Sequence, residues 1–251
     1  MKISTVVITN QKNKEVLDVC IKSAIQNSDE VIIVGNVQYL NYPNVRLVDK
    51  KELAAKGNIG FMRNIGADIA TGEVVVNCDD DIIITPGFKK KVIKYFKSNK
   101  DKESFTTKVL GCYGNRYWDR VIFDSKTGES RLLDYDAPYN EQSYYSGAFM
   151  VRKKLLTDSF KFDTDLGFYE KEDVEYSAKL KAANKTINFN NEIVVVHWDS
   201  SYGTFKHAIH GYLYCDKINK LSSSEDTNNN LVKNDRLAIL TTNTYTYYKN
   251  L

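Results

Sequence analysis

The 251-residue sequence contains no apolar run that approaches the ~20 residues needed to span a bilayer. Its first apolar stretch, residues 3–8, runs directly into the polar residues 10–14 without a small-residue cleavage site. We therefore expect neither a membrane-spanning helix nor a signal peptide at this end.

Cysteine is scarce, and its positions at Cys20, Cys78, Cys112 and Cys215 include no C-x-x-C pair. A disulfide framework or a zinc site is not expected, and a reducing, cytoplasmic location is predicted. A strong excess of one charge is missing as well, because 35 basic and 32 acidic side chains leave a net charge of +3. This balance argues against general nucleic-acid binding, which requires a marked basic excess.

The composition is that of a globular protein, with 42% apolar and 27% charged residues. The length suits one large domain, or one domain with a short appendage. Residues 222–230 form a polar stretch of low complexity that indicates a linker. We predict a domain over residues 1–220, followed by this linker and a C-terminal extension over 221–251.

The first hundred residues alternate between strand and helix patterns. β-Branched and apolar runs predict buried strands, and apolar residues at helical spacing predict helices between them. The strands are expected at 3–8, 31–34, 45–48 and 73–78, the third near a sheet edge, and the helices at 15–25 and 59–70. A further helix is expected to open at Pro86, with Thr85 as its N-cap. This order predicts an α/β fold with a mostly parallel central sheet and helices on both faces.

The second half has a different pattern. An antiparallel pair is expected around Gly114-Asn115, and a helix is expected near residues 172–183. The strands of this half are predicted at 109–113, 117–123, 144–151 (interrupted at Ser146-Gly147), 186–189 and 193–197, and an aromatic-rich helix at 205–221.

Asp79-Asp80-Asp81 follow the fourth predicted strand. Carboxylates at the carboxyl end of a buried parallel strand lie where open α/β sheets place their ligands. Hard oxygen ligands suit Mn²⁺ or Mg²⁺, and such a cation neutralises a departing diphosphate. A solvated acidic turn explains the same triplet, and both interpretations stay open at this point.

Three other features gain meaning only in combination. The glycines of residues 57–66 precede a helix, whose amino end favours phosphate, and Arg63 adds a fork of donors. Glu172-Asp173 open a helix, where acids serve as caps or, functionally, as a general base. His197 ends a strand, where it is either structural or a metal ligand; His207 and His210 lie three residues apart on the predicted aromatic helix.

In this order the pieces resemble the GT-A glycosyltransferases, particularly family 2. The likeness spans roughly residues 3–200. It rests on the opening strand with Asn10, on Asn58 to Glu73, on the D-x-D site at Asp79 and Asp81, and on residues 146–149 with Glu172-Asp173.

The resemblance implies a metal-dependent transfer of one sugar from a nucleotide-sugar donor, a UDP-sugar being favoured, to a hydroxyl of a glycan or glycoconjugate. Asp81 would be the main ligand of Mn²⁺ or Mg²⁺, helped by Asp79 and His197. Asp173, paired with Glu172, would be the base of an inverting displacement. The nucleotide-sugar would be bound by Thr9, Asn10, Asn36, Asn58, Arg63, Asp79 and Asp80, and the sugars would be bordered by Trp118, Ser146 and Gly147.

The sequence departs from the family pattern in two places. Many members carry an acidic pair after the second strand that contacts the base, whereas this chain has Gly35-Asn36, so that contact would fall to Asn36. No Gln-x-x-Arg-Trp follows Glu172-Asp173, which favours transfer of single sugars over processive synthesis.

Three alternatives remain at the level of sequence. A sugar nucleotidyltransferase would need a glycine-rich loop after the first strand, which residues 10–14 lack. A haloacid-dehalogenase phosphatase would carry its aspartates after the first strand, not the fourth. A catalytically silent carbohydrate-binding relative would not need Arg63 and Glu172-Asp173 together with the aspartates. The tail beyond residue 200 would pack on the domain by default, form a dimer contact or touch a membrane surface.

Overall fold

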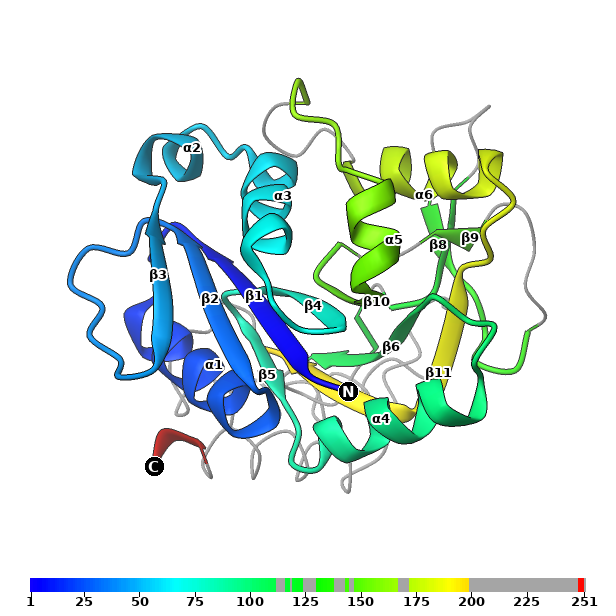
Figure 1. The fold of residues 1–251 in the computed structure, drawn as a ribbon, viewed down its shortest axis with the longest axis horizontal. Coiled ribbons are helices and arrows are strands. Elements are labelled where there is room, and N and C mark those ends of the chain that lie inside the picture. Colours follow the sequence, from blue (N-terminus) through cyan, green and yellow to red (C-terminus); the bar gives the residue numbers. More distant parts are fainter. Residues whose placement is uncertain are drawn as a thin grey trace, which may run out of the picture.

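The computed structural model describes residues 1–111, 116–117, 119–123, 130–137, 143–144, 147–166, 172–198 and 248–250. These residues form one sheet of eight strands and a smaller one of three (Figure 1). The strands are β1 (Ile3–Thr9), β2 (Glu30–Gly35), β3 (Val45–Asp49), β4 (Val74–Asp79), β5 (Ile82–Ile84), β6 (Ser104–Gly111), β7 (Val121–Phe123), β8 (Ser130–Leu132), β9 (Ser143–Tyr144), β10 (Phe149–Lys153) and β11 (Asn188–His197). The helices are α1 (Lys14–Asn27), α2 (Lys51–Ala55), α3 (Ile59–Ile69), α4 (Phe88–Ser98), α5 (Lys154–Ser159) and α6 (Glu172–Ala182).

The large sheet has the strand order β3-β2-β1-β4-β10-β6-β11-β5. Its first four strands are parallel, and β6 and β11 run in the same direction; only β10 and β5 are reversed. The predicted α/β fold with a mostly parallel sheet is confirmed, and β3 is the edge strand that the sequence indicates. The carboxyl ends of β1 and β4 therefore lie side by side, which brings Thr9 close to the aspartates.

Helices cover both faces of the large sheet. In Figure 1, α1 and α4 lie below the sheet, whereas α2, α3, α5 and α6 lie above it. Both faces of the fully buried strand β1 contribute to the core. Ile3 and Val7 pack with α1 and α4 on one face, and Val6 and Ile8 pack with α2 and α3 on the other. This two-sided burial is the reason that the first strand is a continuous apolar run.

Two glycines permit close packing around the end of β1. A Cβ at Gly66 would lie 2.1 Å from Cγ1 of Val6, so α3 rests directly on this strand. Gly35 ends β2 with a φ of +132°, and a Cβ there would lie 2.0 Å from the carbonyl oxygen of Thr9. Both contacts exclude larger residues and fix the backbone that surrounds the aspartates.

The predicted start of the helix after the aspartates is wrong. Gly87, with a φ of +82°, is the N-cap of α4, and the helix begins at Phe88. The Thr85 hydroxyl instead donates to the carbonyl oxygen of Val194 at 2.6 Å. Residues 82–84 form the short strand β5 on β11, and this pairing holds Thr85 outside the helix.

The second half differs from the predicted strands in three places. Residues 144–151 do not form one strand, because β9 belongs to the small sheet and β10 to the large one. Residues 188–197 form the single strand β11, since a shift in register between Asn190 and Val194 lets it continue along β6. The Tyr117 N–H donates to the Val109 carbonyl, as an antiparallel pair requires, but β7 then joins β8 and β9.

The elements absent from the sequence prediction are short: α2, α5, β5 and β8 have three to six residues each. The turn at 114–115, the helix at 205–221 with His207 and His210, and the polar stretch at 222–230 lie outside the described residues. Within the described part of the chain, no helix is long and apolar enough to cross a membrane. Residues 248–250 lie beside α1 (Figure 1).

Candidate active site

A pocket of about 160 Å³ opens at the carboxyl ends of β1 and β4. All three aspartates line it, together with Thr9 and Asn10 from the end of β1. The start of α1 and the residues before α3 form its other walls: Lys12, Asn13, Val16, Ala54, Gly57, Ile59 and Met62. The predicted meeting of the first strand and the D-x-D segment in one cavity is thus present in the structure.

The three aspartate side chains point to three different partners. Asp79 accepts a hydrogen bond from Arg63 at 2.9 Å, and Asp80 accepts one from the Thr9 hydroxyl at 2.6 Å. Asp81 lies 3.4 Å from Nε2 of His197, measured from its Oδ2. This divergence relieves the repulsion that three adjacent carboxylates would otherwise experience.

His197 reaches Asp81 because of the way β11 ends. The strand pairs with β5 so that His197 stands opposite Ile82, and the following Trp198 N–H donates to the Asp81 carbonyl at 2.7 Å. The imidazole is stacked on the Tyr117 ring, with 3.7 Å between centroids and 10° between planes. The ring is therefore held in place on one face while its Nε2 faces the Asp81 carboxylate.

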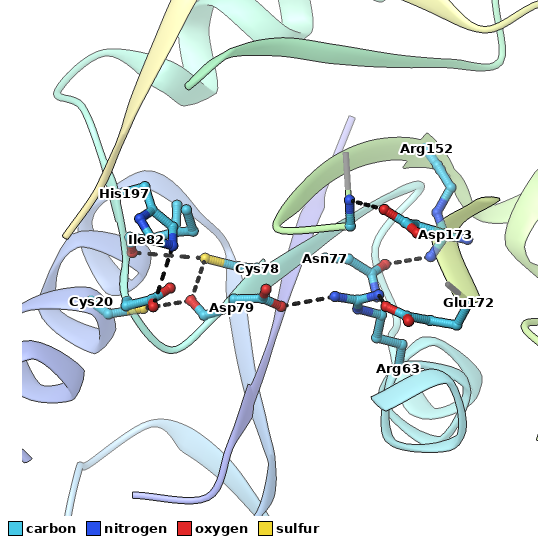
Figure 2. Close-up of polar contacts among 12 residues, drawn as sticks. Cys20, Arg63, Asn77, Cys78, Asp79, Ile82, Arg152, Glu172, Asp173 and His197 are labelled. Carbon is cyan, nitrogen blue, oxygen red and sulfur yellow. Dashed lines mark hydrogen bonds and ion pairs between the residues drawn. The ribbon is translucent and has the colours of Figure 1, made fainter. Parts of the chain in front are cut away.

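Arg63 connects the aspartates to the start of α6. Figure 2 shows its guanidinium between Asp79 and Glu172, with N–O distances of 2.9 and 2.7 Å. Its side chain is 2% exposed, so both ion pairs are largely shielded from water. Arg63 thus binds two protein carboxylates, one from each half of the site, and its predicted contact with the nucleotide stays a prediction.

Burial dominates the electrostatics of this cluster. Desolvation raises the pKa of Asp79 to about 6, although the charge of Arg63 opposes the shift. Desolvation also raises the pKa of Asp80, against the hydrogen bond from Thr9. For Arg63 burial disfavours the charge, but the two carboxylates outweigh it and raise its pKa. The guanidinium therefore stays charged, and Asp79 and Asp80 accept protons more readily than free aspartate.

Asp173 is held by two backbone N–H groups. Its Oδ2 accepts from Gly147 at 3.0 Å, and its Oδ1 accepts from Val174 at 2.8 Å. A Cβ at Gly147 would lie 3.2 Å from Oδ2, so only glycine lets the loop approach this closely without a shift. Burial, followed by the charge of Glu172, raises the pKa of Asp173.

Of the other predicted nucleotide contacts, Asn10 lines the pocket, whereas Asn36 and Asn58 are not among its lining residues. Asn36 follows Gly35, and its Oδ1 is buried with no hydrogen-bond partner among the described residues. Asn10 accepts from the Lys12 N–H at 3.0 Å, which shapes the loop after β1. Asn58 caps α3 through the Phe61 N–H, so its side chain has a structural role. Trp118 and Ser146 lie outside the described residues.

Two residues that the sequence argument passed over also belong to this region. Lys12 lines the pocket, and its charge lowers the pKa of Asp80. The sequence feature that could have indicated Lys12 is a basic residue shortly after the first strand, where phosphate groups bind in many α/β folds. Tyr117 supports His197 by stacking, and no spacing rule links residues so far apart in the sequence.

Comparison with known families identifies the family of the chain. Glycosyl transferase family 2 matches residues 4–160, more than half of the chain. This range contains β1, Arg63 and the three aspartates. No curated protein matches the chain.

Solved structures with related folds include several glycosyltransferases. A structure of GalNAc-T7 with UDP, GalNAc and Mn²⁺ aligns over 79% of this chain and 43% of that one, with 14% identity and a TM-score of 0.61. Residues 1–349 of S. aureus TarS with UDP-GlcNAc align over 79% and 59%, with 18% identity and a TM-score of 0.55. The complex of the same TarS fragment with UDP aligns over 82% and 63%, with 18% identity and a TM-score of 0.54. The chain thus spans less than two thirds of each, and the likeness concerns the fold.

Proposed function

The chain belongs to glycosyl transferase family 2, and we propose that it moves one sugar from a nucleotide-sugar to an acceptor hydroxyl in the synthesis of a surface glycan or glycoconjugate. One observation carries the proposal: Arg63 bridges Asp79, which belongs to the same triplet as Asp81, to Glu172, the neighbour of Asp173 (Figure 2). A donor-binding centre and a base must lie close together for a direct sugar transfer.

The pocket at the end of β1 suits the nucleotide part of the donor. Thr9 and Asn10 lie on its wall, and the positive end of α3 and the charge of Lys12 favour a diphosphate nearby. The buried Oδ1 of Asn36 is an acceptor that the N–H of a pyrimidine base would satisfy. Two of the structural neighbours hold UDP and a third holds UDP-GlcNAc, which supports a UDP-sugar as donor.

The residues around Asp81 fit a divalent cation. Mg²⁺ and related hard cations take one or two protein carboxylates and complete their shell with substrate phosphates and water. Asp81 and His197 would hold Mn²⁺ or Mg²⁺ here. The Asp79 carboxylate faces Arg63 instead, and within the described residues no group of three His, Cys, Asp or Glu side chains is arranged to hold a metal ion. When bound, the cation would neutralise the negative charge of the departing nucleoside diphosphate.

The chain's own residues would carry out the proton transfer. Asp173 accepts the proton of the acceptor hydroxyl, whose oxygen forms a bond to the anomeric carbon of the donor sugar. The bond from that carbon to the phosphate oxygen breaks at the same time, and the nucleoside diphosphate leaves with the electron pair. Attack opposite to the leaving group inverts the anomeric configuration.

The environment of Asp173 suits this role. Two backbone N–H groups fix the direction of its carboxylate, and its raised pKa makes it a stronger base than an exposed aspartate. The negative charge of Glu172 helps to raise the pKa of Asp173, and Glu172 also forms an ion pair with Arg63. The loop at Ser146-Gly147 and the ring of Trp118 would border the donor sugar and the acceptor.

The first test is binding of donors, followed by transfer. A set of UDP-sugars should raise the melting temperature with Mn²⁺ present and less without it, because a ligand of the folded state stabilises that state. Asp173→Asn should keep this shift but lower the transfer rate by roughly 10²–10⁴-fold, the usual contribution of a general base.

Glu175→Gln is the matched control, since it removes the same charge from the same helix and Glu175 pairs with Lys179 at 2.9 Å. It should transfer at nearly the rate of the unmodified protein. If no nucleotide-sugar shifts the melting temperature, the transferase proposal fails. If Asp173→Asn transfers normally, another residue is the base.

A further inference from the structure

The positive charge of this protein is concentrated in one short segment. Residues 88–102, which comprise α4 and the turn after it, contain seven lysines and one aspartate. Their net charge of +6 is twice the +3 of the whole chain, so the remaining residues together carry −3. The near balance of the complete sequence therefore hides a strong local asymmetry.

The lysines of α4 lie on the side opposite to its buried residues. Phe88, Val92 and Phe96 are at most 2% exposed and pack in the core with the large sheet. Lys90, Lys94 and Lys97 follow the spacing i, i+4, i+7, which places them in one row on the outer face; we call them the lysine stripe. In Figure 1, α4 runs along the lower rim of the molecule with its inner side towards the sheet.

Among the described residues, carboxylates pair with only two of the seven lysines of this segment. Lys89 pairs with Asp29 and Lys102 pairs with Asp101. Lys91 donates to the carbonyl oxygen of Glu192 at 2.9 Å. Among the described residues, no carboxylate lies within ion-pair distance of the three lysines of the stripe, which are all exposed.

We propose that the lysine stripe docks this protein on a bilayer that contains anionic lipid. Clusters of four to eight basic residues on an amphipathic helix bind anionic headgroups. Because the apolar face of α4 is buried in the core, the contact is electrostatic adsorption without insertion. The stripe extends over about 10 Å of helix surface, which suits an array of headgroups better than one phosphate.

The charge of the remaining residues favours a planar surface over a long soluble polyanion. A polymer that wraps around the protein would meet residues with a net charge of −3. A bilayer would contact one face only, and charges beyond the Debye length of about 8–10 Å would be screened. The proposal is independent of the sugar-transfer chemistry and assigns membrane contact to α4 instead of the C-terminal tail.

The test is co-sedimentation of the full chain with vesicles of phosphatidylcholine, with and without phosphatidylglycerol. We expect binding only to the anionic vesicles, and weaker binding as salt is added. The variant K90Q/K94Q/K97Q should bind roughly 100-fold more weakly, because each lysine near an anionic surface contributes about fivefold. The variant K90R/K94R/K97R keeps the charge and should bind like the unmodified protein.

K50Q/K51Q/K56Q removes three exposed lysines around α2 and serves as the matched control. Its affinity should stay within about threefold of the unmodified protein, since those charges are remote from the membrane. Absence of binding to anionic vesicles would overturn the proposal. Equal losses in the two glutamine variants, or tighter binding of an inorganic polyphosphate chain that the stripe variant also loses, would overturn it as well.

Discussion

At the scale of single residues, Arg63 holds two carboxylates that would otherwise repel each other in a shielded site. It donates to Asp79 at the end of β4 and to Glu172 at the start of α6, next to Asp173. The rigid guanidinium can donate to carboxylates on two sides at once, whereas the compact ammonium of a lysine is less suited to bridge them. Arg63 therefore links the strand that carries the aspartates to the start of α6.

Arg63→Met should destabilise the protein by about 3–5 kcal/mol, because it leaves two shielded carboxylates without their cation. Urea unfolding measures this change. Lys161→Met is the control, since Lys161 pairs with Asp68 at the surface and an exposed pair contributes about 0–1 kcal/mol. A similarly small effect of Arg63→Met would mean that the bridge contributes little to stability.

A second prediction concerns the pH dependence of transfer. The base must be ionised, so the rate should fall as the pH drops through the raised pKa of Asp173. Burial is the first cause of that raised pKa, and the negative charge of Glu172 is the second. Glu172→Gln removes the second cause and frees Arg63, whose charge lowers the pKa. Both effects should move the acidic limb of the rate profile to lower pH.

Initial rates across the acidic range, compared with those of the unmodified protein, measure this shift. Because the change is defined by the midpoint of the limb, a lower maximal rate does not obscure it. An unmoved limb, or one at higher pH, would contradict the electrostatic link between the two residues.

At the scale of elements, β11 and the C-terminal residues complete the region below the aspartates. The end of β11 places His197 beside Asp81, and the adjacent Trp198 is fully buried. Trp198 packs with residues of α1 and with Tyr248, which is also fully buried. The Tyr248 hydroxyl accepts a hydrogen bond from Asn27 at 2.7 Å. Tyr248 thus belongs to the core beneath the site.

Tyr248→Ala should therefore destabilise the fold by about 3–5 kcal/mol, as removal of a buried aromatic ring usually does. Tyr248→Phe keeps the ring and should cost about 1 kcal/mol for the lost hydrogen bond. Urea unfolding compares both variants with Tyr39→Ala, at an 88% exposed tyrosine, for which a change within about 0.5 kcal/mol is expected. Equal stability of Tyr248→Ala and Tyr39→Ala would show that the C-terminal contact contributes little.

At the scale of the whole molecule, the parallel strands β1 and β4 form the pocket at their carboxyl ends, and the later elements α6 and β11 contribute Asp173 and His197. The backbone joins these parts directly, since the Asp79 N–H donates to the Ala148 carbonyl at 3.0 Å. The charge distribution adds a second property, because the net charge of α4, +5 from five lysines, exceeds the net charge of +3 of the entire chain. Sugar transfer and docking to a surface would thus depend on separate parts of the fold.

Local patterns predicted the first half of the fold well. Each strand of 3–8, 31–34 and 73–78 is buried on both faces, so its apolar run needs no tertiary context to be recognised. The later strands were harder, because β11 continues through a change of register that depends on its partner β6. The prediction of Thr85 as the N-cap of α4 was wrong for a similar reason, because the pairing of β5 with β11 holds Thr85 outside the helix.

The sequence by itself determined the fold class, the family resemblance and the residue types that the site requires. These follow from apolar periodicity and from motifs whose members lie within a few residues of one another. Only the tertiary structure decided which carboxylate faces which partner: Asp79 faces Arg63, Asp80 faces Thr9 and Asp81 faces His197. Those partners are up to 116 residues apart, and contacts at such separations depend on the register of strands and the packing of helices, which no local pattern encodes.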